Sequence, residues 1–232
     1  MAKVKYTKAQ RARKRRRRLR QLIGACFLML ALVGAFSIVY FAVSKLRTVK
    51  DDDDLKLEYA RMIAPLVALD PVPFESVDKV RPELLEQASI WSVIYNEDTA
   101  KYQRNENGQL LIPAVDVDRY FKKLFGSGTL PDHATFTDGD LTFEYDEEAE
   151  SYVIPITGLS GSYVPRISEI ESSGSTKTLT VEYVTYADQT GFSIALPGDD
   201  SGYQVIKKME YILLKEGSEY HIYSVRYASK NS

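Results

Sequence analysis

Two histidines, His133 and His221, are the side chains best suited to proton transfer near neutral pH. A histidine that acts as a general base also needs a second group to orient it. Asp132 is adjacent to His133, but neighbouring side chains point apart in an extended segment. The spacing therefore marks no acid–base pair, and two isolated histidines predict no zinc site. We expect His133 in an exposed loop and His221 on a strand.

Other motifs for ion or phosphate chemistry are incomplete. Asp138-Gly139-Asp140 has the first acids of a calcium loop, but the further acids and the distal glutamate are missing, which favours a turn. Gly126-Ser127-Gly128 ends a predicted helix, whereas a phosphate loop precedes one. Cys26 is the single cysteine and lies in an uncharged stretch, so the rest of the chain has no thiol nucleophile and no disulfide. We expect no catalytic residue, metal or cofactor.

Tyrosine is the one residue type in excess, with 16 in the chain. It suits half-buried strands and supplies rigid contact area at interfaces. The sequence predicts a candidate binding face on the last three strands together with one helix, made of Trp91, Tyr183, Tyr211, Tyr220, Tyr223 and Tyr227. Filling of the core is the competing interpretation of the same residues.

Three helices must precede these strands. Apolar residues recur at helical spacing from Leu55 to Leu69, and Pro65 is expected to kink or interrupt that helix. Pro82 marks the first turn of a second helix, whose apolar stripe includes Trp91. Asp116 is suited to cap a third helix that ends at Gly126. Between the second and third helices, the Asn-Gly pair that ends residues 105–108 predicts a hairpin.

After Gly126 the apolar residues alternate with a period of two, which predicts strands. The strand segments are the alternating sets Leu141, Phe143, Tyr145 and Tyr152, Ile154, Ile156, then 163–170, 179–183, 203–214 and 220–227. Polar residues occupy the alternate positions, so one face is expected to be buried and one wet. The predicted fold class is α+β, with an N-terminal transmembrane helix followed by helices packed on a curled antiparallel sheet.

The N-terminal region predicts a membrane anchor. Residues 22–44 carry no charge, and 23 residues make a helix of about 34 Å, enough to cross a bilayer core. Eleven basic and no acidic residues occupy positions 1–20, which places that end in the cytoplasm. Removing these eleven from the 30 basic residues leaves 19 against 32 acidic ones, a formal charge of -13 for the remainder.

The anchor is expected to stay on the chain. Its basic region and apolar run are both longer than those of a cleavable signal, although Ala42-Val43-Ser44 has the small residues of a cleavage site. Residues 23–26 match a lipobox in composition but precede the apolar run. We expect a basic tail at 1–20, a signal-anchor at 21–45, a charged linker at 46–54 and an extracytoplasmic domain at 55–229.

The order of helix, helix, hairpin, helix and then a meander of long strands resembles the cone-shaped fold of nuclear-transport-factor-like and ketosteroid-isomerase-like domains. A cystatin-like sheet wrapped on one helix is the alternative. Such a domain behind a signal-anchor is similar to extracytoplasmic modules of Gram-positive membrane proteins. Enzymes of the cone family use a tyrosine and carboxylic acids. Tyr59, Tyr95, Asp116 and Asp118 lie on suitable elements, but no spacing assigns any of them a role.

The sequence favours a membrane-anchored, extracytoplasmic interaction module of a bacterial cell envelope. The bilayer, through the anchor, is one expected partner; an envelope protein, a wall polymer or a second copy is another. Nucleic acid is not expected, because no aromatic residue interleaves the arginines of residues 11–20. The alternative is a small isomerase-like or hydrolase-like enzyme with its site inside the cone.

Overall fold

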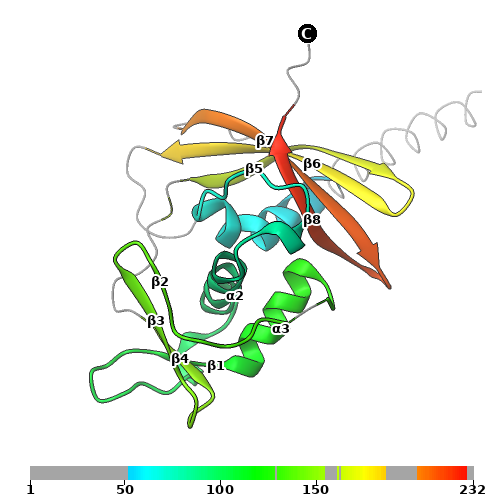
Figure 1. Cartoon of the computed structure of the whole chain (residues 1–232). Helices are drawn as coiled ribbons and strands as arrows, with labels where there is room; N and C mark the ends of the chain where they lie inside the picture. The colour runs from blue at the N-terminus through cyan, green and yellow to red at the C-terminus, as the bar shows by residue number, and fades with distance from the viewer. Residues whose placement is uncertain (1–51, 129, 155–160, 162, 187–202, 229–232) are drawn as a thin grey trace, which may run out of the picture. The chain divides into compact units, whose positions relative to one another are not determined.

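The computed structural model describes residues 52–128, 130–154, 161, 163–186 and 203–228. All of these residues except Asp52 belong to one compact unit, Asp53–Ser232, that contains both helices and strands. Figure 1 shows two sheets with helices between them. The predicted anchor at 22–44, its cleavage site and its lipobox, and Ile156 of the predicted strands, all lie outside the described residues.

Three α-helical segments supply the middle of the domain. Residues 52–68 are helical, and the helix continues through Pro65, so the expected interruption is wrong. Helix α2 is Pro82–Asn96, with its proline in the first turn as predicted. Helix α3 is Ala114–Phe125; Asp116 lies in its first turn rather than at the cap, and Gly126 ends it at a φ of 89°.

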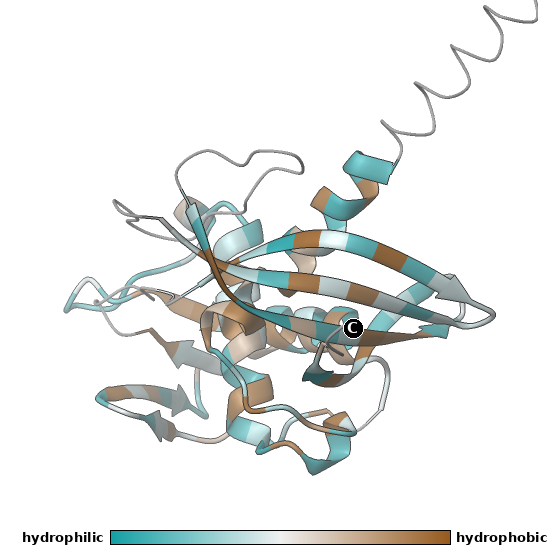
Figure 2. Cartoon of the chain, turned by 90° about the horizontal axis from the view of Figure 1, so that it is seen from above, coloured by the Kyte–Doolittle hydropathy of each residue, from teal (hydrophilic) through white to brown (hydrophobic). Residues whose placement is uncertain are grey.

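The larger sheet has the order β5-β6-β7-β8, and every pair in it is antiparallel. Its strands are β5 Val164–Ser173, β6 Thr176–Tyr186, β7 Tyr203–Glu216 and β8 Glu219–Tyr227. The outer edge of β8 is covered at Val225, where Phe74 and Val225 exchange two backbone hydrogen bonds of 2.8 and 3.0 Å. Polar and apolar residues alternate along these strands (Figure 2), as the sequence predicts.

Three β-bulges interrupt the pairing of the larger sheet. They fall between Ile167 and Glu169 on β5, between Val205 and Lys207 on β7, and between Ile222 and Ser224 on β8. A bulge adds one residue to one strand and therefore reverses the inward and outward positions beyond it. The extra residues on β7 and β8, Ile206 and Tyr223, are exposed.

The smaller sheet has the order β1-β4-β3-β2. Its strands are β1 Leu111–Pro113, β2 Phe136–Asp138, β3 Leu141–Asp146 and β4 Ser151–Val153. The predicted hairpin at 105–108 is reduced to a single bridge between Arg104 and Leu110, and β1 pairs with β4 instead. Strand β1 precedes α3 in the chain, yet it completes a sheet whose other strands all follow α3.

Helix α2 is shared by two hydrophobic cores. Ala88 packs with Ile63 and Tyr211 between the helical segment 52–68 and the larger sheet. Ile90 and Trp91 pack with the residues of the smaller sheet. All nine residues from 85 to 93 are buried, polar ones included. The helices therefore form a layer with a sheet on either side.

The predicted fold class is corrected in two respects. One curled sheet was expected, but the strands form two separate four-stranded sheets, because β4 pairs with β1 and β3 and does not continue the meander. An apolar spanning helix was also part of that class. Within the described ranges, no helix has both the length and the apolar character needed to cross a bilayer.

Candidate functional site

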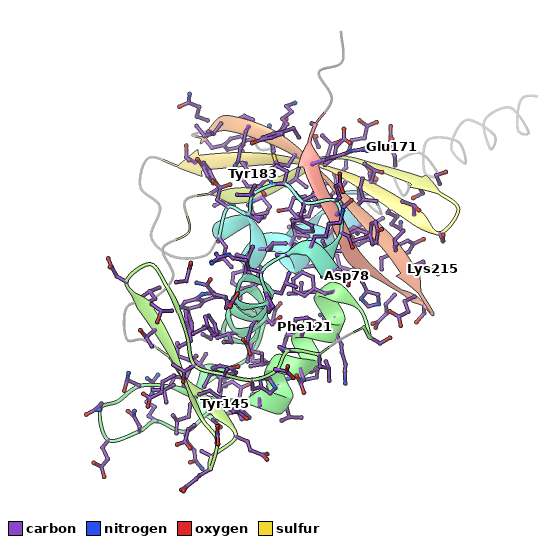
Figure 3. All side chains as sticks on the ribbon, viewed as in Figure 1. Asp78, Phe121, Tyr145, Glu171, Tyr183 and Lys215 are labelled. Carbon is purple, nitrogen blue, oxygen red and sulfur yellow. The ribbon has the colours of Figure 1, made fainter. Side chains whose placement is uncertain are left out.

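A hollow of about 620 Å³ lies between the 3₁₀ turn η1 (Val77–Lys79), α2, α3, β8, Gly128 and residues 130–132. We call it the acidic hollow, because Asp78, Glu86 and Asp132 line it and, among the residues that the structure describes, no lysine or arginine does. Apart from Ser76 and Gly128, its other lining residues have aromatic, aliphatic or proline side chains, which include Leu85, Phe121, Phe125, Leu130, Ile222 and Tyr223. In Figure 3, Asp78 and Phe121 are labelled at this place.

Glu86 joins the acidic hollow to a buried polar cluster. Its carboxylate accepts a hydrogen bond from the Tyr152 hydroxyl, and its Oε1 lies 3.3 Å from Nδ1 of His133. His133 Nδ1 is also 3.1 Å from the Tyr152 hydroxyl oxygen, and Nε2 is 3.2 Å from Oδ1 of Asp118. One imidazole therefore stands between two carboxylates from two helices. The ring also stacks on Tyr145, with centroids 5.3 Å apart.

Burial governs the electrostatics of this cluster. Glu86 is only 4% exposed, and its burial raises the pKa of the carboxyl above the ordinary value, although the Tyr152 hydroxyl and His133 oppose the shift. Burial, followed by the hydrogen bond to Glu86, also raises the pKa of the Tyr152 hydroxyl. Tyr152 therefore remains a neutral donor, while Glu86 holds its proton more tightly than an exposed glutamate does.

The cluster has the parts of an acid–base system. A carboxyl with a raised pKa, a tyrosine that donates to it and a histidine held by a second carboxylate are the groups that move protons in enzymes. Asp118 Oδ1 is buried and, despite its closeness to His133, accepts no well-aligned hydrogen bond. No group of three or more metal-ligating side chains occurs in the described part of the chain.

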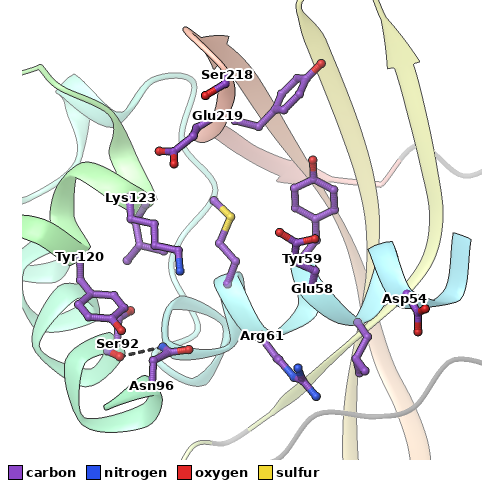
Figure 4. A pocket seen from close by; sticks show the side chains of 14 residues that line it. Asp54, Glu58, Tyr59, Arg61, Ser92, Asn96, Tyr120, Lys123, Ser218 and Glu219 are labelled. Carbon is purple, nitrogen blue, oxygen red and sulfur yellow. Dashed lines mark hydrogen bonds between the residues drawn. The ribbon is translucent and has the colours of Figure 1, made fainter. Parts of the chain in front are cut away.

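A second hollow, of about 560 Å³, lies between the helical segment 52–68, α2, α3 and the β7–β8 turn (Figure 4). Acidic and basic side chains both line it, namely Glu58 and Glu219 on one hand and Arg61 and Lys123 on the other. Burial, and then the charge of Glu58, raises the pKa of Tyr59 to about 12, so this hydroxyl stays neutral. A lining with both signs of charge favours neither a cationic nor an anionic ligand.

The six residues of the predicted binding face are not brought together. Trp91 is buried at the smaller sheet, where its ring meets Phe143 edge-on at 6.0 Å. Tyr183 and Tyr211 are fully buried in the core of the larger sheet, as the competing interpretation has it. Figure 3 shows Tyr183 on that sheet, away from the smaller sheet that carries Tyr145.

The three tyrosines of β8 lie in different surroundings. Tyr220 lines the second hollow and Tyr223 lines the acidic hollow, while Tyr227 is exposed beyond both. The bulge at Tyr223 is the cause, because it turns this side chain outward while Ile222 and Val225 stay buried. Of the predicted face, Tyr223 is the member that borders the acidic hollow.

Sequence reasoning missed both Glu86 and the surroundings of His133. His133 lies in a loop as predicted, but it is largely buried rather than exposed, with 17% of its side chain accessible. His221 lies on β8 as predicted, with Nδ1 3.1 Å from the Lys123 carbonyl oxygen. Between 47 and 66 residues separate Glu86 from His133 and Tyr152, so no local spacing indicates the cluster.

Ser76 and Lys79 have the S-x-x-K spacing of a serine–lysine nucleophile pair, which sequence reasoning also overlooked. Their contacts argue against that chemistry. Lys79 Nζ binds Glu75 at 2.6 Å, and Ser76 Oγ donates to Asp78 at 3.2 Å. Ser76 is therefore a wall of the acidic hollow without an activating base.

Comparison with protein-family models, curated proteins and solved structures found no match for this chain. The resemblance to cone-shaped domains therefore stays a prediction from the order of the elements.

Proposed function

We propose that this chain is a membrane-anchored, extracytoplasmic binding module of a bacterial cell envelope. The anchoring is supported by the uncharged residues 22–44 and by the basic charge concentrated on one side of them. The absence of cysteine after Cys26 fits an envelope in which disulfides are not relied upon. The binding role rests on one observation, the acidic hollow.

The acidic hollow has the properties of a binding site rather than a packing defect. Its volume of about 620 Å³ falls in the range of ligand pockets, and apolar walls with a few polar groups are typical of them. Tyr223 is 43% exposed at its border and can be covered by a ligand. Exposed aromatic residues beside a pocket are common at the centre of protein interfaces.

The topology can be tested with single cysteines in a Cys26→Ser background. We expect an impermeant maleimide added to intact cells to label Glu148→Cys, which is in the exposed β3–β4 turn. Lys8→Cys is the matched control and should react only after the membrane is opened. Labelling of Lys8→Cys in intact cells, or release of the protein by carbonate, would contradict the proposal.

The binding role can be tested with a photo-crosslinking amino acid in the full chain. Placed at Tyr223, it should give one discrete cross-linked species in membranes. Placed at Val72, which is 82% exposed and does not line the acidic hollow, it should not. Equal cross-linking from both positions would mean that Tyr223 marks no specific site.

A second function, acid–base catalysis, is favoured by the buried Glu86 carboxyl facing Tyr152. Because Glu86 also lines the acidic hollow, a substrate bound there would meet a proton donor or acceptor. Hydrolysis of p-nitrophenyl acetate by the full chain in nanodiscs measures the hydrolase version. A rate above that of empty nanodiscs that is lost in Glu86→Gln would support it, and no rate above them would end it.

A further inference from the structure

The geometry points to a ligand class for the acidic hollow: a peptide segment that carries lysine or arginine beside an apolar side chain. This inference rests on the proposed function, because it names what the binding module binds. It is carried by three properties of the hollow, which are the sign of its charge, the apolar character of its walls and the exposure of its border.

The charge of the hollow has one sign. Asp78 and Asp132 are exposed carboxylates at its wall, and neither forms an ion pair with another described residue. Glu86 adds a third, buried carboxyl. The nearest basic side chains pair with acids outside the hollow: Lys79 binds Glu75, and Arg81 lies 3.8 Å from Asp138. A cationic group in the hollow would therefore meet carboxylates without competition from an internal lysine or arginine.

The other hollows described in the structure lack this bias. The hollow of Figure 4 contains Arg61 and Lys123 beside its acids. A third, along α3, has Arg119 and Lys122 opposite Asp116 and Glu216. On the outer face of the larger sheet, Lys208 and Arg226 accompany Glu210. The acidic hollow alone among these four has acids and no lysine or arginine.

The walls require that the cation bear an apolar body. Leu85, Phe121 and Ile222 are buried at the hollow, and a small inorganic cation would leave these surfaces wet. Phe125 and Tyr223 add aromatic rings, which attract lysine and arginine through their faces. An apolar side chain followed by a cationic one satisfies both requirements.

Anionic occupants are disfavoured by the same charges. A phosphate-rich wall polymer or an anionic lipid headgroup would approach the exposed carboxylates of Asp78 and Asp132, and like charges oppose binding. A second copy of the domain is also disfavoured, because everything after Arg20 has a formal charge of -13. That charge instead speeds the approach of a cationic segment, an effect that salt weakens.

The test uses the full chain in phosphatidylcholine nanodiscs, with empty nanodiscs as the blank. The probe is a fluorescent, end-blocked pentapeptide of lysine, leucine and phenylalanine, followed by anisotropy. One control peptide replaces lysine by glutamate, and another replaces leucine and phenylalanine by serine. We expect saturable binding of the first peptide only, weakened by salt.

The variant Asp78→Asn with Asp132→Asn should weaken binding by about tenfold or more, about 1.4 kcal/mol. The matched control, Asp140→Asn with Glu171→Gln, removes two exposed charges outside the hollow and should change affinity by less than about twofold. Tyr223→Ser tests the apolar wall without disturbing buried residues and should also weaken binding. Circular dichroism verifies that each variant is folded.

Equal losses in both double variants, or equal binding of the serine peptide, would overturn the assignment. So would the absence of binding at about 1 mM peptide. If the peptide fails while the cross-linker at Tyr223 captures a discrete species, the ligand class is wrong and the binding module stands. If the peptide binds but Lys8→Cys is labelled from outside, the ligand class stands and the topology is wrong.

Discussion

The hydroxyl oxygens of Tyr183 and Tyr211 lie 2.6 Å apart on neighbouring strands, in the core beneath the larger sheet. Both side chains are fully buried. Burial raises the pKa of both hydroxyls, so each remains neutral and one donates to the other. The two tyrosines that looked suited to a binding face thus satisfy one another inside the domain.

This pair predicts a non-additive double-mutant cycle. Tyr183→Phe or Tyr211→Phe alone leaves one buried hydroxyl without its partner, and should lower the free energy of unfolding by about 1–3 kcal/mol. The double variant removes both hydroxyls and should cost less than the sum of the two. Urea unfolding of all four proteins measures the coupling, and additive losses would mean that the pair does not interact.

Gly126 ends α3 at a φ of 89°, and a Cβ there would come within 2.8 Å of Glu216 Oε2. Glu216 in turn accepts from the Ser127 amide at 3.1 Å. We expect Gly126→Ala to lower the stability by about 1–2 kcal/mol through backbone strain. Gly128→Ala, where no positive φ or near atom opposes a Cβ, should change it by less than about 0.5 kcal/mol. Equal effects would contradict this role of Gly126.

Glu86 and Glu97 predict opposite dependences of stability on pH. The raised pKa of Glu86 means that the folded state holds the proton more tightly, so its contribution is complete below the ordinary value of 4.5 and is lost as pH rises. Hydrogen bonds from Lys101, Arg119 and Tyr120 lower the pKa of Glu97 to about 2. Its contribution is complete above 4.5 and is lost as pH falls towards about 2.

We therefore expect Glu86→Gln to gain stability relative to the parent as pH rises above 4.5. Glu97→Gln should be less stable than the parent above pH 4.5, and this difference in the free energy of unfolding should shrink as the pH falls below 4.5. Urea unfolding at a series of pH values measures both differences. Because His133 is an ionisable group in contact with Glu86, the Glu86 comparison is repeated in a His133→Asn background. A pH-independent difference for Glu86→Gln in both backgrounds would contradict the assignment.

Lys207 joins the end of the helical segment 52–68 to β7. Its Nζ binds Asp70 and lies 4.7 Å from the centroid of the Tyr183 ring. Lys207→Met keeps the apolar stem and removes the charge, which should cost about 0.5–1.5 kcal/mol because the pair is only partly buried. Asparagine readily adopts a left-handed φ such as the 49° at Asp70. Asp70→Asn therefore removes the charge without straining the backbone. Thermal unfolding of both variants and their double should show coupling.

The sequence was sufficient for the elements whose signals are local. Pro82 and Gly126 lie where predicted, and the turn between the last two strands falls at 217–218, between the predicted segments 203–214 and 220–227. A missing N–H or a positive φ acts within a few residues. The helix at 82–96 was predicted to have one apolar stripe, but both of its sides are covered. Ser89 and Ser92 can be buried because they donate to the carbonyls four residues earlier, at 2.8 and 2.7 Å.

Pairing between distant segments could not be predicted. Nothing local in 111–113 indicates that it pairs with 151–153, so two sheets looked like one. The bulge at Tyr223 has no glycine to indicate it, and the alternation of tyrosines along β8 suggested that Tyr223 and Val225 share a face. The candidate site depends on both features, since Tyr152 comes from the smaller sheet and Tyr223 from the bulge.

The backbone bridge between Phe74 and Val225 covers part of the β8 border of the larger sheet, and β5 forms the other border. On β5, Pro165 lacks an amide hydrogen, Ser168 is bulged, and Glu169 and Glu171 are exposed acids. A sheet with one border partly covered and the other interrupted by proline, a bulge and charge is a poor template for a further strand. Many copies of this domain held close together would therefore resist joining into fibrils.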